Sequence, residues 1–224
     1  MNFQNIQCLT LDTAPLSHRE QIEGLCAAGA KWIQLRMKAA GDEEVAAVAE
    51  GVLPLCREHQ CRLIINDRVQ VARRVGADGV HLGKNDMPWR EARDLAGGRL
   101  LIGGTVNSVE DARAARASGC LDYVGVGPFR FTRSKQNLAP VLRGEQWREI
   151  RAILGDFPAY AIGGITPEDL PQVRSLGLHG IAISAALYRH PELPETYRSF
   201  ASHFDSFSPY SNKEFYEHTI GHRR

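Results

Sequence analysis

The sequence lacks the features of membrane, secreted and nucleic-acid-binding proteins. No apolar run approaches the about 18 residues of a membrane-spanning helix, and the N-terminus has no basic segment followed by an apolar one. Lys and Arg number 27 and Asp and Glu 26, so the formal net charge is only +1. Such a balance gives no general attraction to nucleic acid or to an anionic membrane. We therefore expect a soluble, cytoplasmic protein that binds neither, with its oligomeric state left open, a homo-oligomer included.

Cysteine is scarce and unpatterned. The five cysteines are odd in number and form no CxxC pair, which argues against a disulfide framework. Reduced and mostly buried thiols are expected. They are Cys8, Cys26, Cys56, Cys61 and Cys120.

Short apolar segments alternate with helical ones along most of the chain. The predicted strands are 6–11, 31–38, 63–65, 79–82, 100–105, 121–126, 158–162 and 180–183. Eight strands, each followed by a helix, predict an α/β fold with a single (β/α)8 TIM barrel, and an open doubly wound sheet is the alternative. We assign residues 1–193 to the barrel. Residues 194–224 form a C-terminal extension, expected to be a helix and then a disordered tail.

Helix-terminal residues predict where several helices begin. Ser17 with Glu20 three residues later reads as a capping box, and Ser108 precedes an Ala-rich helix. Thr166 followed by Pro167 places a cap and a first-turn proline at another helix start.

Two acidic residues follow neighbouring strands. Asp67 comes directly after the apolar run at 63–65, and Asp86 comes shortly after the strand at 79–82. In a parallel sheet both would lie on the same edge, about 5 Å per strand apart. Two such carboxylates repel each other unless a cation or a proton lies between them, and we favour a shared Mg²⁺. The alternative is that each acid only caps the helix after it.

The second predicted strand has an unusual polar face. Gln34, Arg36 and Lys38 alternate with apolar residues, so they share one side of the strand. Arg and Lys together suit a diphosphate. A solvated edge strand is the alternative.

Two further regions have the composition of phosphate-binding loops. Residues 130–135 contain two hydroxyl and three cationic side chains after the sixth strand. Gly163-Gly164 and Gly180 to Ser184 accompany the seventh and eighth strands, where barrels often bind phosphate through backbone N–H groups. A polar surface loop and a pair of tight turns are the respective alternatives. His81, inside a strand, is assigned a structural role.

At this point the sequence resembles the thiamine-phosphate synthase family, from the first strand to about Leu187. The motifs that carry the resemblance are Gln34 to Lys38, Ile65-Asn66-Asp67, Gly76 to Gly83 with Asp86, Asp122 to Pro128, Thr132 to Lys135, and Ala161 to Ile165. The departures are Ser134 in place of a threonine, Thr105 in place of a serine, and Gly104 in place of a larger apolar residue.

The resemblance implies a transferase that joins a pyrimidine diphosphate to a thiazole phosphate and releases pyrophosphate. It implies Mg²⁺ on Asp67 and Asp86. Arg36, Lys38 and Lys135 would stabilise the departing pyrophosphate. The pyrimidine diphosphate would contact Gln34, Arg36, Lys38, Asn66, Thr105 and Lys135, and the thiazole phosphate would contact Thr132, Arg133, Ser134, Gly164, Ile183 and Ser184.

Two other functions are consistent with the same sequence. A related thiazole tautomerase carries a histidine after the fifth strand, where this chain has Asn107. A non-catalytic phosphate-binding barrel is the second, because a fold does not by itself imply an activity.

Overall fold

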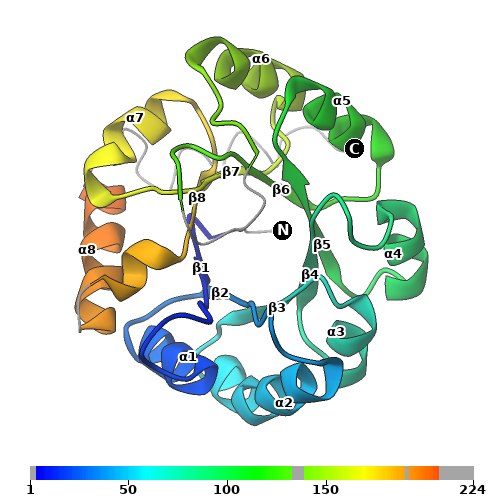
Figure 1. Cartoon of the computed structure of the whole chain (residues 1–224), viewed down its shortest axis with the longest axis vertical. Coiled ribbons are helices and arrows are strands. Elements are labelled where there is room, and N and C mark those ends of the chain that lie inside the picture. The colour runs from blue at the N-terminus through cyan, green and yellow to red at the C-terminus, as the bar shows by residue number, and fades with distance from the viewer. Residues whose placement is uncertain (1–3, 133–138, 190–191, 207–224) are drawn as a thin grey trace, which may run out of the picture.

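The computed structural model describes residues 4–132, 139–189 and 192–206, and in them eight parallel strands close into one barrel (Figure 1). Each strand pairs with its neighbours in sequence, and β8 pairs with β1. The closed ring confirms the predicted barrel and excludes the open sheet. The strands are β1 (Ile6–Leu9), β2 (Trp32–Leu35), β3 (Arg62–Asn66), β4 (Gly79–Leu82), β5 (Leu101–Val106), β6 (Tyr123–Val126), β7 (Ala159–Ile162) and β8 (Gly180–Ile183).

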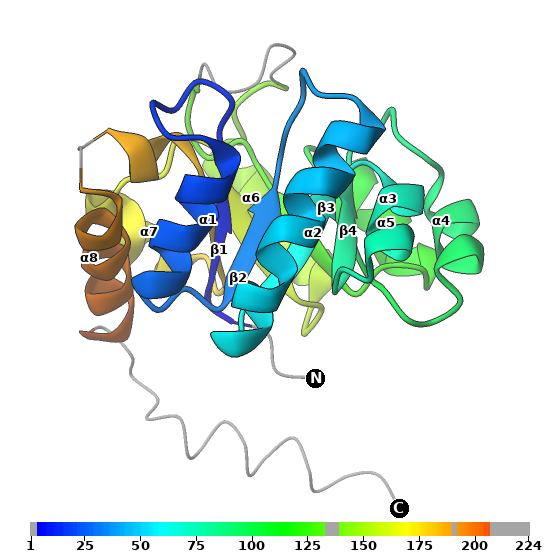
Figure 2. The same ribbon diagram turned by 90° about the horizontal axis from the view of Figure 1, so that it is seen from below.

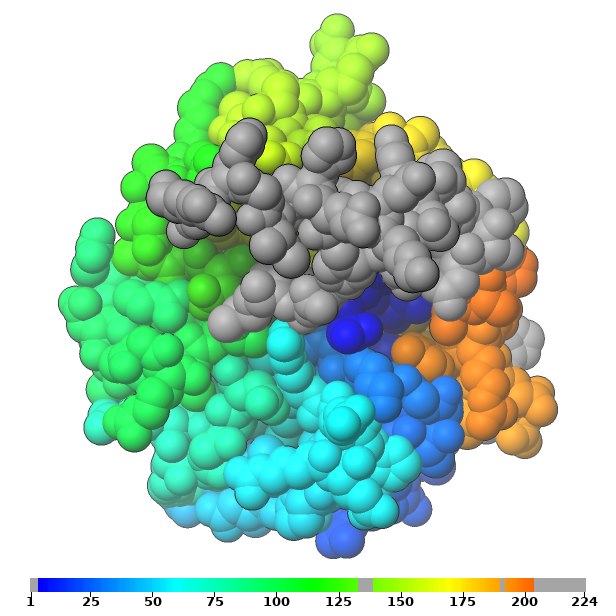
Figure 3. Space-filling model, turned by 180° about the vertical axis from the view of Figure 1, so that it is seen from behind, coloured from blue at the N-terminus to red at the C-terminus, as the bar shows by residue number. Residues whose placement is uncertain are grey.

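Helices surround the barrel in chain order, and outside the grey atoms the space-filling view shows successive segments side by side around the molecule (Figure 3). The helices are α1 (His18–Ala27), α2 (Asp42–Glu58), α3 (Val69–Val75), α4 (Trp89–Ala96), α5 (Val109–Ser118), α6 (Gly144–Leu154), α7 (Leu170–Ser175) and α8 (Leu193–Ser206), with the 3-10 turns η1 (Pro167–Asp169) and η2 (Ala185–Tyr188). Helix α8 packs beside α1 (Figure 2). The predicted tail beyond Ser208 lies outside the described residues.

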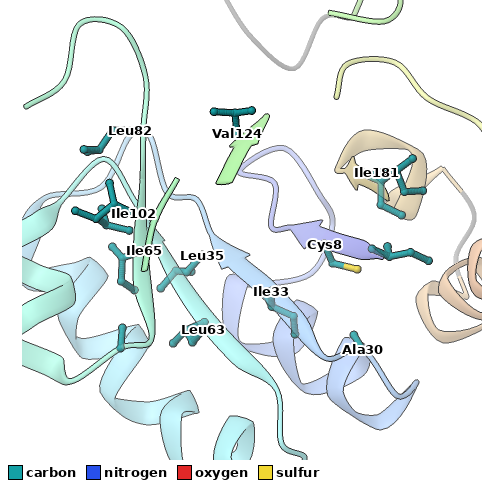
Figure 4. Packing of buried hydrophobic residues seen from close by; sticks show 14 of the residues in the cluster. Cys8, Ala30, Ile33, Leu35, Leu63, Ile65, Leu82, Ile102, Val124 and Ile181 are labelled. Carbon is teal, nitrogen blue, oxygen red and sulfur yellow. The ribbon is translucent and has the colours of Figure 1, made fainter. Parts of the chain in front are cut away.

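The main core lies between the strands and the helices. Ile33 pairs in register with Leu63, and Leu35 with Ile65, and these side chains pack in the layer beneath the helices (Figure 4). All four are at most 1% exposed. Side chains at the alternate positions enter the barrel, as the period of two predicts.

An aromatic layer fills the barrel interior toward the amino ends of the strands. The Trp32 ring meets Tyr123 and Tyr160 edge to face, with centroids 4.8 Å and 4.9 Å apart. Each of these three residues is 1% exposed, and Ile64 and Leu101 complete the cluster. The layer forms a packed floor beneath the carboxyl end of the barrel.

Most of the local predictions agree with the structure. Ser17 and Glu20 form a capping box at α1, and the Ser108 hydroxyl accepts the Asp111 N–H at the start of α5. All five cysteines are buried and free, as expected. No helix among the described residues is long and apolar enough to cross a membrane.

Two predicted elements differ from the structure. Thr166 is the N-cap and Pro167 lies in the first turn, as predicted, but the element that they begin is the 3-10 turn η1, which precedes α7. The strand predicted at 31–38 ends at Leu35, so Arg36 and Lys38 lie beyond it. The backbone N–H groups of these two residues bond to Thr10 and Asp12 side chains.

Candidate active site

A cavity of about 660 Å³ lies at the carboxyl ends of the strands. Its wall combines the ends of β1, β5, β7 and β8 with the segments that follow β2 and β6. Six residues predicted from the sequence line it: Arg36, Thr105, Thr132, Gly164, Ile183 and Ser184. This is the end at which TIM barrels place their active sites.

A cluster of charged side chains lies on the same edge, at the ends of β2, β3 and β4. The Lys38 ammonium forms an ion pair with the Asp67 carboxylate, and the Asp67 and Asp86 carboxyl groups lie close enough to shift each other's pKa. The structure therefore brings together the three charged side chains predicted from separate strands. Their contact agrees with the edge position inferred from the sequence.

Asp67 adopts a backbone conformation that few side chains tolerate. Its φ is 64°, in the left-handed region that Asp and Asn enter more readily than most residues. Its N–H donates to the His81 carbonyl oxygen at 2.8 Å, which ties the end of β3 to β4. The α3 cap position belongs to Arg68, without a side-chain cap. The capping alternative for Asp67 is therefore wrong.

Asp86 interacts with a nearby backbone group in addition to Asp67. Its Oδ2 accepts the Gly83 N–H at 2.6 Å and closes the turn after β4, while Pro88 holds the α4 cap position. Burial and the Asp67 carboxylate raise the pKa of Asp86, whereas the hydrogen bond from the Gly83 N–H lowers it. Burial opposes ionisation of Asp67 too, but bonds from Asp86 and Lys38 hold its pKa below the ordinary value. Without a bound cation, a proton therefore binds to the Asp86 carboxylate in preference to the Asp67 carboxylate.

Arg36 and Lys38, the two cations that follow β2, differ in their surroundings. Lys38 is exposed, whereas Arg36 is half-buried on the cavity wall. Burial lowers the pKa of Arg36, and the Asp12 and Asp67 carboxylates oppose that shift. Arginine keeps its charge under such shifts, so Arg36 presents a cation to the cavity.

Two buried amides lie among these charges. Asn66 is 5% exposed, and its Nδ2 has no partner among the described residues, which leaves a buried donor for a ligand. Gln34 is 1% exposed, and its Nε2 donates to Gln7 at 3.3 Å. Gln34 therefore belongs to the barrel interior beneath the cavity.

A chain of polar groups crosses that interior. Gln7 donates to the Tyr123 hydroxyl at 3.1 Å, His81 Nδ1 lies 3.2 Å from that hydroxyl, and His81 Nε2 lies 3.2 Å from the Thr105 hydroxyl. A Cβ on Gly103 would come within 2.5 Å of His81 Nδ1, so only glycine leaves room for this contact. His81 is a satisfied buried histidine, as predicted, and it also lines the cavity.

The opposite wall of the cavity consists mainly of backbone and hydroxyl groups. Gly163 and Gly164 have φ of 104° and 68°, and a Cβ on Gly164 would lie 2.9 Å from Arg130 Cβ. Both the positive φ and the close packing against the segment after β6 therefore require glycine here. The buried Ser184 Oγ has no partner among the described residues. Arg133, Ser134 and Lys135 lie outside the described residues.

The acidic pair fits a divalent cation of the magnesium type. The described residues contain no group of three or more His, Cys, Asp or Glu side chains arranged to hold a metal. Mg²⁺ needs no such cage, since one or two carboxylates with substrate phosphates and water complete its octahedron. Asp67 and Asp86 are a donor set of that kind, because their carboxyl groups lie close enough to shift each other's pKa.

Several residues near the site carried no recognisable sequence signal. Arg189 lines the cavity, while Thr10 and Asp12 bind the backbone just beyond β2. Asp12 ends an apolar run just as Asp67 does, which is the one pattern that could have pointed to it.

The fold and the cavity define a (β/α)8-barrel enzyme. Residues 10–187 match the family model described as thiamine monophosphate synthase. The thiamine-phosphate synthase of Bacteroides fragilis is 45% identical over 192 residues, covering 84% of this chain and 94% of that protein. A Methanospirillum hungatei enzyme of the same name is 39% identical over 185 residues, covering 83% and 89%.

A solved structure agrees. The thiamine phosphate pyrophosphorylase of Pyrococcus furiosus superposes with a TM-score of 0.81 at 30% identity, covering 90% of this chain and 96% of that one. This chain therefore belongs to the thiamine-phosphate synthase family of transferases, as its motifs indicated.

Proposed function

We propose that the chain condenses 4-amino-2-methyl-5-(diphosphooxymethyl)pyrimidine with 4-methyl-5-(2-phosphoethyl)thiazole to form thiamine phosphate and pyrophosphate. The thiazole carboxylate would give the same products with loss of CO2. The observation that carries the proposal is the division of one cavity into two unlike walls. One wall adjoins a cluster of acids and cations, and the other offers glycine backbone and hydroxyl groups.

The charged wall suits the diphosphate. Arg36 supplies a planar donor fork, and Lys38 a point charge that is paired with Asp67 in the free protein. The Asn66 amide, which has no partner among the residues that the structure describes, offers a further donor. Asp67 and Asp86 are the proposed Mg²⁺ ligands, and the ion would supply positive charge to the diphosphate oxygens. Thr105, on the cavity wall, would contact the pyrimidine. Gln34 lies buried beneath the cavity, so the direct contact expected for it is not proposed.

The opposite wall suits the thiazole phosphate. Gly164 lines the cavity without a side chain, and Ser184 offers a hydroxyl with no partner among the described residues. Ile183 and Thr132 complete this wall. Arg133 and Ser134 are proposed to join it, and Lys135 to contact the pyrophosphate.

The reaction needs no nucleophile from the protein. The pyrimidine C–O bond breaks, the electron pair leaves with pyrophosphate, and the thiazole nitrogen attacks the resulting methylene cation. Arg36, Lys38 and Lys135 stabilise the charge that develops on pyrophosphate. The two walls hold the partners close together, which replaces a bimolecular encounter by an oriented one.

The tautomerase alternative requires a proton-transfer group after β5. Asn107 occupies that place, and its Nδ2 donates to the Gly127 carbonyl at 2.7 Å. An amide that holds the backbone in this way has no proton to exchange at neutral pH. We therefore keep the synthase as the proposed function.

The test is to mix purified protein with both substrates and Mg²⁺, and to follow thiamine phosphate and pyrophosphate together. Equal formation of the two, abolished by EDTA and restored by Mg²⁺, is expected. Binding of both ligands without turnover would favour the non-catalytic barrel. Proton exchange on the thiazole carboxylate phosphate without the pyrimidine would favour the tautomerase.

A further inference from the structure

The segment that carries Arg36 and Lys38 lacks the usual support of a strand. Strand β2 ends at Leu35, and the last backbone bond from β1 joins the Thr10 N–H to the Gln34 carbonyl at 3.0 Å. The next N–H groups bond to side chains instead. Arg36 N–H donates to Thr10 Oγ1 at 2.9 Å, and Lys38 N–H donates to Asp12 Oδ2 at 3.1 Å.

One histidine connects these two supports. His18 Nδ1 lies 2.8 Å from Thr10 Oγ1, and His18 Nε2 lies 3.0 Å from Asp12 Oδ1. Thr10 is fully buried, and the His18 and Asp12 side chains are 14% and 31% exposed. His18 is the first residue of α1, whose start is fixed by the Ser17–Glu20 capping box. The histidine therefore joins a helix terminus to both supports.

The hydrogen bonds form a chain with consistent directions. Arg36 N–H donates to the Thr10 oxygen, the Thr10 hydroxyl donates to His18 Nδ1, and the His18 Nε2–H donates to Asp12. Asp12 also accepts from Lys38. With His18 neutral, each of these groups therefore donates or accepts in the one way that its other hydrogen bonds leave available. Loss of one member leaves its neighbour without its partner.

We propose that Thr10, Asp12 and His18 are positioning residues that direct Arg36 and Lys38 toward the diphosphate. The proposal rests on the proposed function. The three side chains touch neither the Asp67–Asp86 pair nor the glycine wall through any of these bonds. Their removal should therefore weaken diphosphate binding and spare the thiazole phosphate.

The test compares the variants His18→Ala, Asp12→Ala and Asp12→Asn with Arg19→Ala. Arg19 is the next residue of α1 and pairs only with the exposed Glu23 among the interactions described for it, so its variant is the matched control. Three quantities are measured: KM for each substrate, kcat, and the calorimetric affinity for inorganic pyrophosphate with Mg²⁺. Thermal melting controls for folding.

We expect His18→Ala and Asp12→Ala to raise KM for the pyrimidine diphosphate and the Kd for pyrophosphate by about tenfold, since each loses a hydrogen bond that orders a charged group. KM for the thiazole phosphate should change less than about twofold. Asp12→Asn keeps an oxygen for Lys38 N–H and should lie between wild type and Asp12→Ala. Arg19→Ala should match wild type.

Two outcomes would overturn the positioning role. One is an unchanged pyrophosphate affinity in folded His18→Ala and Asp12→Ala, and the other is an equal loss for both substrates in proportion to lost stability. The pyrophosphate measurement needs no turnover, so it separates the two proposals. Wild-type protein that binds pyrophosphate through this network but forms no product would refute the synthase reaction alone, and wild-type protein that does neither would refute both.

Discussion

The same eight strands form two unlike ends of the barrel, one closely packed with aromatic side chains and the other hollowed by the cavity. At the amino end, Trp32, Tyr123 and Tyr160 pack edge to face and leave almost no exposed surface. At the carboxyl end, a cavity is lined by a half-buried cation, glycines and a serine hydroxyl that has no partner in the described part of the chain. Unsatisfied groups there cost folding free energy that the aromatic floor helps to offset.

The comparison assigns different consequences to substitutions at the two ends. A change at the amino end should lower the free energy of unfolding and leave the chemistry of folded molecules intact. A change at the carboxyl end should lower activity and leave stability nearly unchanged. The following predictions test that separation, from the largest expected effect to the smallest.

Trp32→Ala should have the largest effect, a loss of about 3–5 kcal/mol of unfolding free energy, because it leaves a void among three packed rings. Denaturant unfolding measures it. Trp32→Phe should lose less, because it keeps an aromatic ring in the layer. A Trp32→Phe variant that is stable but inactive would show that the floor takes part in the chemistry, and would break the comparison.

Asp67→Asn should lower kcat about a hundred- to a thousandfold, because it removes the carboxylate that pairs with Lys38 and contacts Asp86. Steady-state kinetics at varied Mg²⁺ measure the loss. Asp42→Asn is the control, since Asp42 is an exposed carboxylate on the same rim that pairs with Arg68. Full activity of Asp67→Asn would remove Asp67 from the mechanism.

Ser184→Ala should raise KM for the thiazole phosphate about tenfold to a hundredfold, because a hydroxyl bond to a charged ligand is lost. Stability should hold or rise slightly, because that hydroxyl has no partner among the described residues of the free protein. Kinetics and melting together check both halves. A drop in stability with unchanged KM would assign Ser184 to the scaffold.

Gly164→Ala should raise the same KM about tenfold, because alanine disfavours a φ of 68° and its Cβ would lie 2.9 Å from Arg130 Cβ. Gly119→Ala provides the control. Gly119 has a similar φ of 62° at the end of α5, with nothing within 4 Å of an added Cβ. The control shares the backbone strain and should keep a normal KM.

His179→Gln should have the smallest effect, confined to acidic pH. Burial and then Arg151 lower the pKa of His179, which precedes β8 at the amino end, and its Nδ1 accepts the Ala159 N–H at 3.2 Å. The unfolded chain therefore binds a proton at higher pH than the folded one, and stability falls as the pH drops below about 6.5. Melting between pH 5 and 8 should show a shallower fall in His179→Gln. An unchanged slope would contradict this assignment.

The sequence predicted best what short segments determine by themselves. The apolar runs predicted all eight strands, and Ser17 and Ser108 marked two helix starts, because periodicity and caps are local properties. The contact of Asp67 with Asp86 was also predictable, since parallel strands bring their ends to one edge.

The features that could not be predicted depend on contacts between distant segments. The end of β2 at Leu35 is determined by side chains of Thr10 and Asp12, which lie more than twenty residues earlier. The left-handed backbone of Asp67 depends on the His81 carbonyl across the sheet. No local pattern encodes either contact.

The aromatic floor also constrains the order of events during a reaction cycle. Because Trp32, Tyr123 and Tyr160 close the barrel interior, the substrates and products of the proposed reaction would share the carboxyl face for entry and exit. The substrate that binds deepest in the cavity must then bind first, and the product that lies deepest must leave last. Under the proposed reaction, product-inhibition patterns should therefore indicate an ordered rather than a random sequence of substrate binding and product release.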